Sequence, residues 1–160
     1  MGVKCSVDTS AIDAYFKAVV DIACFELKRT FARLGEECII KVRDREPWES
    51  WIDRTGNLRS SIGYGVYDYG RKEIESTFKI VKKGKNGPKA GKQLLDELSK
   101  MYADTYALIV VAGMDYADEV EALENKDVLA STELYARSVI NNRMKKTKKK
   151  ILSRIDKLSL

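Results

Sequence analysis

A helical repeat in the first quarter of the chain most constrains the fold. From Thr9 to about Val42, apolar residues recur every three or four positions, and charged side chains fall on the other faces. At about 1.5 Å per residue this predicts one amphipathic helix of roughly 45–50 Å, whereas a compact domain of this size is about 40 Å across. The helix therefore either bends near Gly35 or protrudes from the domain. The apolar positions are Ile12, Phe16, Val19, Val20, Ala23, Leu27, Phe31, Leu34 and Cys38.

The middle of the chain predicts a small, mainly antiparallel sheet. Residues 61–68 and 73–81 alternate apolar with polar or small side chains, and residues 68–72 have the composition of a tight turn. Residues 106–112 form a nearly continuous apolar run rich in β-branched side chains, which is typical of the most buried strand of a sheet.

Further helices are predicted around these strands. A short helix is expected over Gln93–Asp104, Asp115 is placed to cap a short turn of helix, and a last helix is expected from a Ser131 cap to about Leu158. The expected fold class is α+β: a long N-terminal helix and a C-terminal helix packed on a small, mainly antiparallel sheet. The length of 160 residues favours a single domain covering residues 1–160.

Positive charge is concentrated in a basic helical tail, residues 141–160. Eight Lys or Arg against one acidic residue give this tail +7, so the other 140 residues carry −2 of the chain's net +5. With the lysine-rich loop at 82–92, the tail forms a candidate surface for phosphate groups; a solvated face and a patch for an acidic protein remain alternatives. No DNA-reading motif accompanies it. The candidate basic patch comprises Lys82, Lys83, Lys85, Lys89, Lys145, Lys146, Lys148, Lys149 and Lys150.

No pattern points to catalysis, a cofactor or a metal. The chain has no histidine, and Cys5, Cys24 and Cys38 lack the spacing of a metal or redox motif, so we expect buried or half-buried thiols. There is no Gly-rich phosphate loop, serine elbow or paired-carboxylate motif. No run approaches the roughly 18 apolar residues of a membrane helix, and the N-terminus lacks a signal-peptide core. We expect a non-enzymatic protein made in the cytoplasm, without cofactor or membrane association.

Two short blocks of sequence carry a family resemblance. The first starts like a helix or turn and is followed by the predicted strands. The second runs from the last predicted strand into a short helix. The blocks contain Arg54, Thr55, Gly56, Asn57, Leu58, Arg59, Ser60 and Ser61, and Gly113, Asp115, Tyr116, Ala117, Val120 and Glu121. In this order, the two blocks resemble the neck and tail-component proteins of long-tailed bacteriophages, which are small head–tail joining and tail-completion proteins, over most of residues 9–157.

The resemblance implies a structural virion protein of a phage or prophage, made in the cytoplasm of the bacterial host. Such proteins act in head–tail joining or tail completion through contacts with other head, neck and tail proteins, generally as homo-oligomeric rings. Genome DNA passing through such a ring would meet a basic lining without sequence reading. The alternative is a nucleic-acid-associated protein that binds the phosphate backbone non-specifically through its basic C-terminal tail.

Three surfaces are candidates for subunit contacts. They are the outer face of the first helix, the basic loop at 82–92, and the turn that carries Trp48 and Trp51. Two tryptophans three residues apart either anchor an interface or pack under the sheet. The polar members of the first block, Asn57, Arg59 and Ser60, either satisfy the local backbone or meet a neighbouring subunit.

Overall fold

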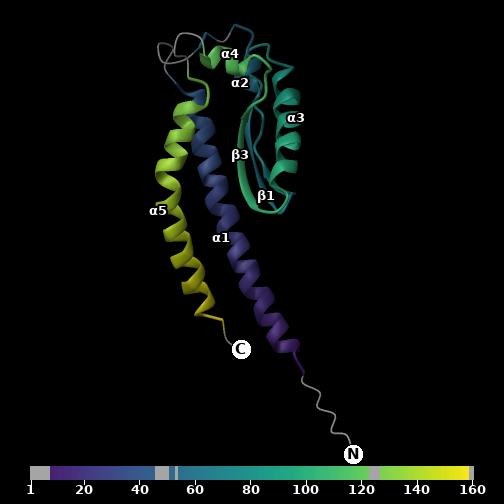
Figure 1. Ribbon diagram of the computed structural model, residues 1–160, viewed down its shortest axis with the longest axis vertical. Helices are drawn as coiled ribbons and strands as arrows, with labels where there is room; N and C mark the ends of the chain where they lie inside the picture. The colour runs from purple at the N-terminus through teal and green to yellow at the C-terminus, as the bar shows by residue number, and fades with distance from the viewer. Residues whose placement is uncertain (1–7, 46–50, 53, 123–126, 159–160) are drawn as a thin grey trace, which may run out of the picture.

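One unbroken helix sets the long dimension of the molecule. The computed structural model describes residues 8–45, 51–52, 54–122 and 127–158. Helix α1, Ser10–Arg43, runs without a bend past the rest of the molecule (Figure 1), so the protruding alternative is the correct one. The other elements are α2 (Asn57–Ser60), β1 (Ile62–Asp68), β2 (Arg71–Glu75), α3 (Gly87–Ser99), the 3-10 turn η1 (Lys100–Tyr102), β3 (Tyr106–Ala112), α4 (Ala117–Ala122) and α5 (Ala130–Ile155).

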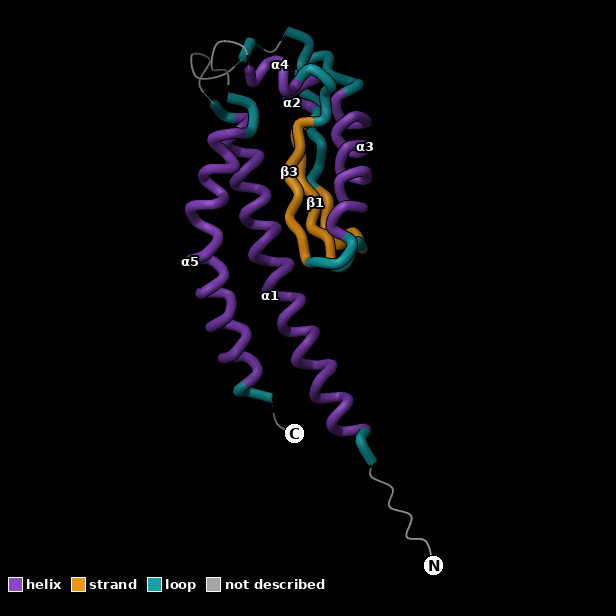
Figure 2. The backbone as a smooth tube through the Cα atoms, viewed as in Figure 1, coloured by secondary structure: helices purple, strands orange, loops and turns teal. Residues whose placement is uncertain are grey.

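The elements are stacked in layers. The three strands form an antiparallel sheet in the order β2-β1-β3. Helix α3 covers one face of this sheet and α1 covers the other, while α5 lies along the outer side of α1 (Figure 2). The α+β class is confirmed. A two-residue turn joins β1 to β2, and both of its residues, Tyr69 and Gly70, have positive φ angles, as a type I′ hairpin requires.

Two predictions about the strands are wrong. The second strand ends at Glu75 rather than residue 81, because the hydroxyl of Ser76 accepts the Tyr64 N–H at 2.8 Å and so takes a ladder donor of β1. The apolar strand 106–112 lies at the edge of the sheet, and β1 is the central and most buried strand. Because helices cover both faces, an edge strand here also has apolar side chains on both sides.

The predicted basic loop is shorter than expected because α3 begins at Gly87 rather than residue 93. Pro88 occupies the first turn of α3, where its missing N–H has no helical partner to lose. The Gly-Pro-Lys composition suggested a flexible loop, but here the proline starts a helix.

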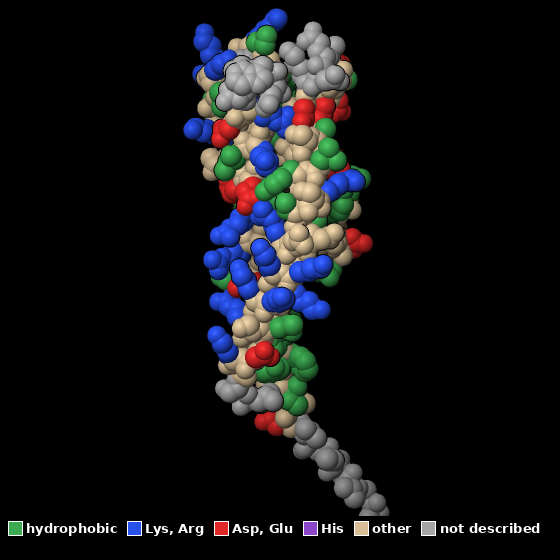
Figure 3. Space-filling view, turned by 90° about the vertical axis from the view of Figure 1, so that its left-hand side faces the viewer, with side chains coloured by type: hydrophobic (Ala, Val, Ile, Leu, Met, Phe, Trp, Pro, Cys, Tyr) green, Lys and Arg blue, Asp and Glu red, His purple; other side chains and the backbone are tan. Residues whose placement is uncertain are grey.

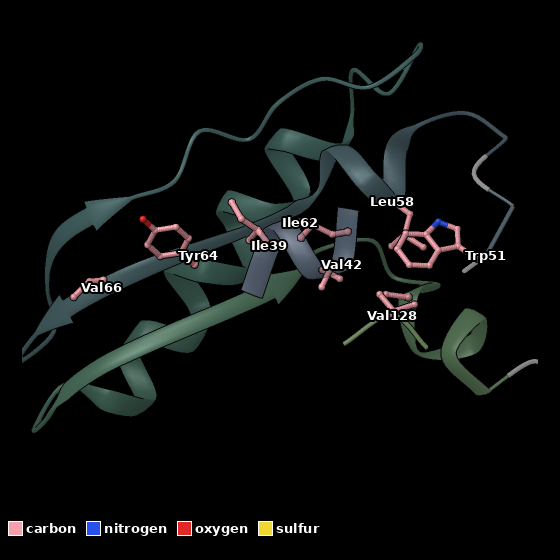
Figure 4. Packing of buried hydrophobic residues seen from close by; sticks show 10 residues of the cluster. Ile39, Val42, Trp51, Leu58, Ile62, Tyr64, Val66 and Val128 are labelled. Carbon is pink, nitrogen blue, oxygen red and sulfur yellow. The ribbon is translucent and has the colours of Figure 1, made fainter. Parts of the chain in front are cut away.

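Two apolar cores lie on the two faces of the sheet. Side chains of β1 alternate between them, so Ile62, Tyr64 and Val66 pack toward α1 while Tyr67 packs toward α3. The first core closes near the end of α1, where Trp51 and Val128 join it (Figure 4). Its buried members are Ile39, Val42, Trp51, Leu58, Ile62, Tyr64, Val66, Ala112, Ala117 and Val128.

Polar contacts hold α5 against α1. The buried residues of α5 are Thr132 and Thr147, and the Thr147 hydroxyl is hydrogen-bonded to that of Thr30 at 2.7 Å. Glu37 accepts hydrogen bonds from both terminal guanidinium nitrogens of Arg143 and from the Tyr135 hydroxyl. The hydrogen bond from Arg143 lowers the pKa of Glu37 below its ordinary value near 4.5. This helix pair therefore depends on an ionised carboxylate.

We predict that acid weakens the α1–α5 contact. Because the pKa of Glu37 is lower in the folded state, its contribution to stability is complete above about pH 4.5 and is lost as pH falls through the folded pKa. The Glu37→Gln variant should be less stable than the parent at neutral pH, by about 1–3 kcal/mol, and this difference should shrink on acidification. Thermal unfolding followed by circular dichroism between about pH 3 and pH 7 measures the difference.

The matched control is Glu97→Gln on the exposed side of α3, where the carboxylate makes no ion pair among the described residues. It should follow the pH profile of the parent. A Glu37→Gln variant that loses as much stability in acid as the parent would contradict the assignment.

Candidate functional site

The two sequence blocks meet at one end of the sheet. They come together because β1 starts and β3 ends there, with Ile62 opposite Ala112. The N–H of Gly113 donates to the carbonyl oxygen of Ser61 at 3.3 Å. A Cβ atom built on Gly113 would lie 2.4 Å from the Cα of Gly91 in α3, so this approach of three segments requires glycine. We call this meeting point the glycine junction.

The first block also clamps the connection between β2 and α3. Gly56 has a φ of +85°, and a Cβ atom there would lie 2.0 Å from the carbonyl oxygen of Val81. The Ser60 hydroxyl accepts the Val81 N–H at 2.8 Å, and the Asn57 side-chain oxygen accepts the Asn86 N–H at 3.3 Å. Asn57 and Ser60 therefore bind backbone within this chain, but 29 and 21 residues away and not in the local turn that the first alternative predicted.

Arg59 joins the same block to the end of α1. Its guanidinium donates to the carbonyl oxygen of Arg43 at 2.6 Å and lies over the ring of Trp51, 5.3 Å from its centroid. Leu58 is buried beside this ring, and its carbonyl accepts the Ser61 hydroxyl at 2.8 Å. Thr55 accepts the Asn57 N–H at 3.3 Å, whereas Arg54 is exposed. The first block thus mainly connects elements within this chain and is not mainly a binding surface.

The candidate interface at the tryptophans requires a correction. Only 5% of Trp51 is exposed, so this ring is part of the core and not a surface for a partner. Its place in the core follows from the packing of Leu58, Val42 and Val128 around it. Trp48 lies outside the described residues.

The second block positions the start of α5. A carboxylate oxygen of Glu121 accepts the N–H groups of Leu129 and Ala130 at 3.0 and 2.6 Å, which caps the helix and places negative charge at its N-terminus. Ser131 was expected to be the cap but instead donates its N–H to Asp127. Hydrogen bonds from Ser131 and Arg45 outweigh burial and lower the pKa of Asp127.

The other members of the second block lie around this turn. Ala117 is buried in the first core, Val120 packs against it, and Tyr116 is exposed. Asp115 was expected to cap α4, but its side chain makes no hydrogen bond within the described part of the chain. The N–H of Ala117 instead donates to the carbonyl oxygen of Met114 at 2.8 Å.

An exposed apolar face remains on the N-terminal half of α1. Ile12, Phe16 and Val20 are four residues apart and 46%, 61% and 57% exposed, so they form one stripe along the helix, which we call the α1 stripe. Among the described residues, the ion pair between α5 and α1 that lies nearest the N-terminus of α1 joins Arg154 to Glu26 at 2.9 Å. Helix α1 continues from there toward its N-terminus and ends beyond the end of α5 (Figure 1). The stripe is therefore a candidate surface for a neighbouring molecule.

The candidate basic patch is two separate groups of side chains. Lys82, Lys83, Lys85 and Lys89 lie around the start of α3, on the far side of the sheet from α1 (Figure 1). Lys145, Lys146, Lys148, Lys149 and Lys150 lie in the distal half of α5 and are exposed. Arg29 and Arg33 of α1 also belong to this second group. The sequence does not single them out, because they look like ordinary solvated residues of a helix. Lys and Arg side chains gather over the middle of this face (Figure 3).

The described residues contain no group of three or more Cys, Asp or Glu side chains placed to hold a metal ion. Cys38 is a buried and Cys24 a half-buried free thiol, and burial raises the pKa of both; Cys5 lies outside the described residues. No described helix is long and apolar enough to span a membrane. No family of proteins, curated protein or solved structure matches this chain.

We predict that the Gly56→Ala variant is destabilised by at least about 2 kcal/mol. The new methyl group would force both a strained left-handed conformation and a clash with the Val81 carbonyl, which cannot move without disturbing the Ser60 hydrogen bond. Urea unfolding of both proteins measures the difference. The neighbouring variant Thr55→Ala loses one exposed hydrogen bond of 3.3 Å and should change stability by less than about 1 kcal/mol. Equal stability of Gly56→Ala and the parent would contradict the clamp.

Proposed function

We propose that this protein is a structural component of the neck or upper tail of a phage or prophage, and that it acts in head–tail joining or tail completion by assembling with copies of itself. The observation that carries the self-assembly is the α1 stripe on a helix that extends beyond its own sheet and beyond α5. The resemblance of the two sequence blocks supports the kind of assembly.

Burial of the α1 stripe against a partner would be energetically favourable. Covering a large apolar side chain stabilises an interface by about 1.5–3 kcal/mol relative to leaving it exposed. Ile12, Phe16 and Val20 are aligned and about half exposed or more, so a single complementary surface can cover all three. The same helical face is continuous with Leu34 and Cys38, which are buried in this chain. A neighbouring copy would thus extend the packing that α1 already makes.

The expected geometry is a ring. In a head-to-tail arrangement the protruding half of α1 contacts a different surface on the next subunit, and such interfaces close into rings when the rotation between subunits permits. A ring with a central opening is also the architecture that the family resemblance implies.

We predict that the protein forms a discrete oligomer larger than a dimer and that the α1 stripe is required for it. Light scattering at about 10 to 200 µM protein should give one oligomeric mass for the parent, and electron microscopy of the same sample should show rings. The double variant Phe16→Ser, Val20→Ser should be a monomer with unchanged circular dichroism, because both side chains lie outside the core.

The control is Asp21→Ser, which changes an exposed residue on the opposite face of the same helical turn. This variant should retain the parent mass. A parent protein that stays monomeric over the whole concentration range, or a double variant that still forms the parent oligomer, would refute assembly through the α1 stripe.

A further inference from the structure

The distal part of α5 and the middle of α1 enclose a long polar groove. Two adjoining hollows of about 260 and 390 Å³ lie along it and share Glu26, Arg29 and Lys150 in their walls. Cations line the groove on both sides. They are Arg29 and Arg33 on α1, and Arg143, Lys146, Lys149, Lys150 and Arg154 on α5. We refer to this set as the α1–α5 groove.

The two acidic residues in the groove already have partners. Glu37 forms its ion pair with Arg143, and Glu26, which is 4% exposed, forms one with Arg154. Within the described part of the chain, the other cations of the groove form no ion pair at all. The groove therefore contains five cations that form no ion pair among the described residues, although Arg33 is near enough to Glu37 to help lower its pKa: Arg29, Arg33, Lys146, Lys149 and Lys150.

These cations are arranged as two facing rows. Arg29 and Arg33 are one turn apart on α1, and Lys146 and Lys150 are one turn apart on α5. The two helices are fixed between the rows by the hydrogen bond of Thr30 with Thr147 and by the two ion pairs. Like charges at such spacing repel each other and oppose folding, so an anion bound between the rows would relieve the repulsion.

We propose that the α1–α5 groove binds the phosphate backbone of duplex DNA without reading its sequence. On α5 the unpaired cations from Lys146 to Lys150 span about 6 Å, and the ion-paired Arg143 and Arg154 lengthen the row to about 16 Å at about 1.5 Å per residue. This full length spans several base pairs of a duplex, in which the phosphates of each strand recur every 3.4 Å or so along the helix axis. A compact anion such as free phosphate would occupy only one end of such a row.

Sequence-independent binding follows from the composition of the groove. No aromatic side chain of the described residues lines either hollow, and the Arg154 guanidinium lies over the nearby exposed ring of Phe25, 5.1 Å from its centroid, so the groove itself offers bases no stacking surface. The groove lies between two helices rather than on a projecting helix that enters the major groove. An acidic protein is the competing partner, but two facing rows of cations, four arginines and three lysines in all, fit a regular polyanion better than individual carboxylates. The inference does not depend on the proposed function, because one chain contains the whole groove.

The test is fluorescence anisotropy with labelled duplexes of about 20 base pairs in two unrelated sequences, at about 50 to 300 mM salt. Both duplexes should bind with equal affinity, and affinity should fall steeply with salt. The variant Arg29→Gln, Arg33→Gln should bind about 10-fold more weakly at about 100 mM salt and should lower the salt slope by about 2. These residues lie outside the lysine run of the tail, so their effect reports on the groove itself.

The matched control is Lys83→Gln, Lys85→Gln, which removes the same charge from the group near α3. Its affinity should stay within about 2-fold of the parent. The monomeric variant Phe16→Ser, Val20→Ser should still bind with the parent's salt slope, which separates failure of this inference from failure of self-assembly. Circular dichroism of each variant confirms folding.

Three results would overturn the proposal. One is absence of DNA binding at low salt and high-micromolar protein. Another is an equal loss of DNA affinity in the Arg29→Gln, Arg33→Gln variant and the Lys83→Gln, Lys85→Gln variant, which would mean that binding depends on net charge alone. The last is that labelled poly-glutamate binds and DNA does not, with the poly-glutamate binding dependent on Arg29 and Arg33. That result would assign the groove to an acidic protein.

Discussion

The structure depends on a mismatch of length between one helix and one sheet. Helix α1 has 34 residues and is about 51 Å long, whereas the seven-residue strands of the sheet extend about 23 Å. The sheet can therefore cover only half of the helix. The remaining half needs other partners, and α5 supplies only some of them, since it ends before α1 does (Figure 1). The surfaces available for function on α1 follow from this difference.

The two ends of the molecule differ in how tightly they are packed. At one end, glycine backbones approach closely at Gly91 and Gly113, buried hydroxyls such as that of Ser60 bind backbone, and Trp51 closes the core. That end tolerates little change. At the other end, the helices present charged and apolar side chains to solvent and are joined by a few polar contacts. A rigid joint thus supports an extended, solvent-exposed surface.

The sequence predicts the elements that periodicity specifies and fails where single side chains decide. Helix α1, the β1–β2 hairpin and strand β3 follow from regular spacing of apolar residues. The end of β2 depends on one hydroxyl, that of Ser76, which no repeat pattern reveals. Gly35 suggested a bend in α1, but its lack of a side chain accommodates the ring of Tyr64, which a Cβ atom would approach to 2.5 Å. The edge position of β3 is equally invisible, because helices on both faces give edge and central strands the same apolar composition.

The sequence reveals only part of each candidate surface, because the fold brings together residues that are far apart in the chain. The lysines of α5 are a run in the sequence, but Arg29 and Arg33 join them only because α5 folds back along α1. The α1 stripe and the α1–α5 groove lie at different levels of α1, since Val20 is six residues, more than a full turn, from Glu26, where the groove begins. A neighbour on the stripe would therefore leave the groove open. If copies assemble through the stripe, each contributes one groove, and several weak phosphate sites on one particle bind a long duplex far more tightly than one site does. Self-assembly and backbone binding would then reinforce each other without any shared residue.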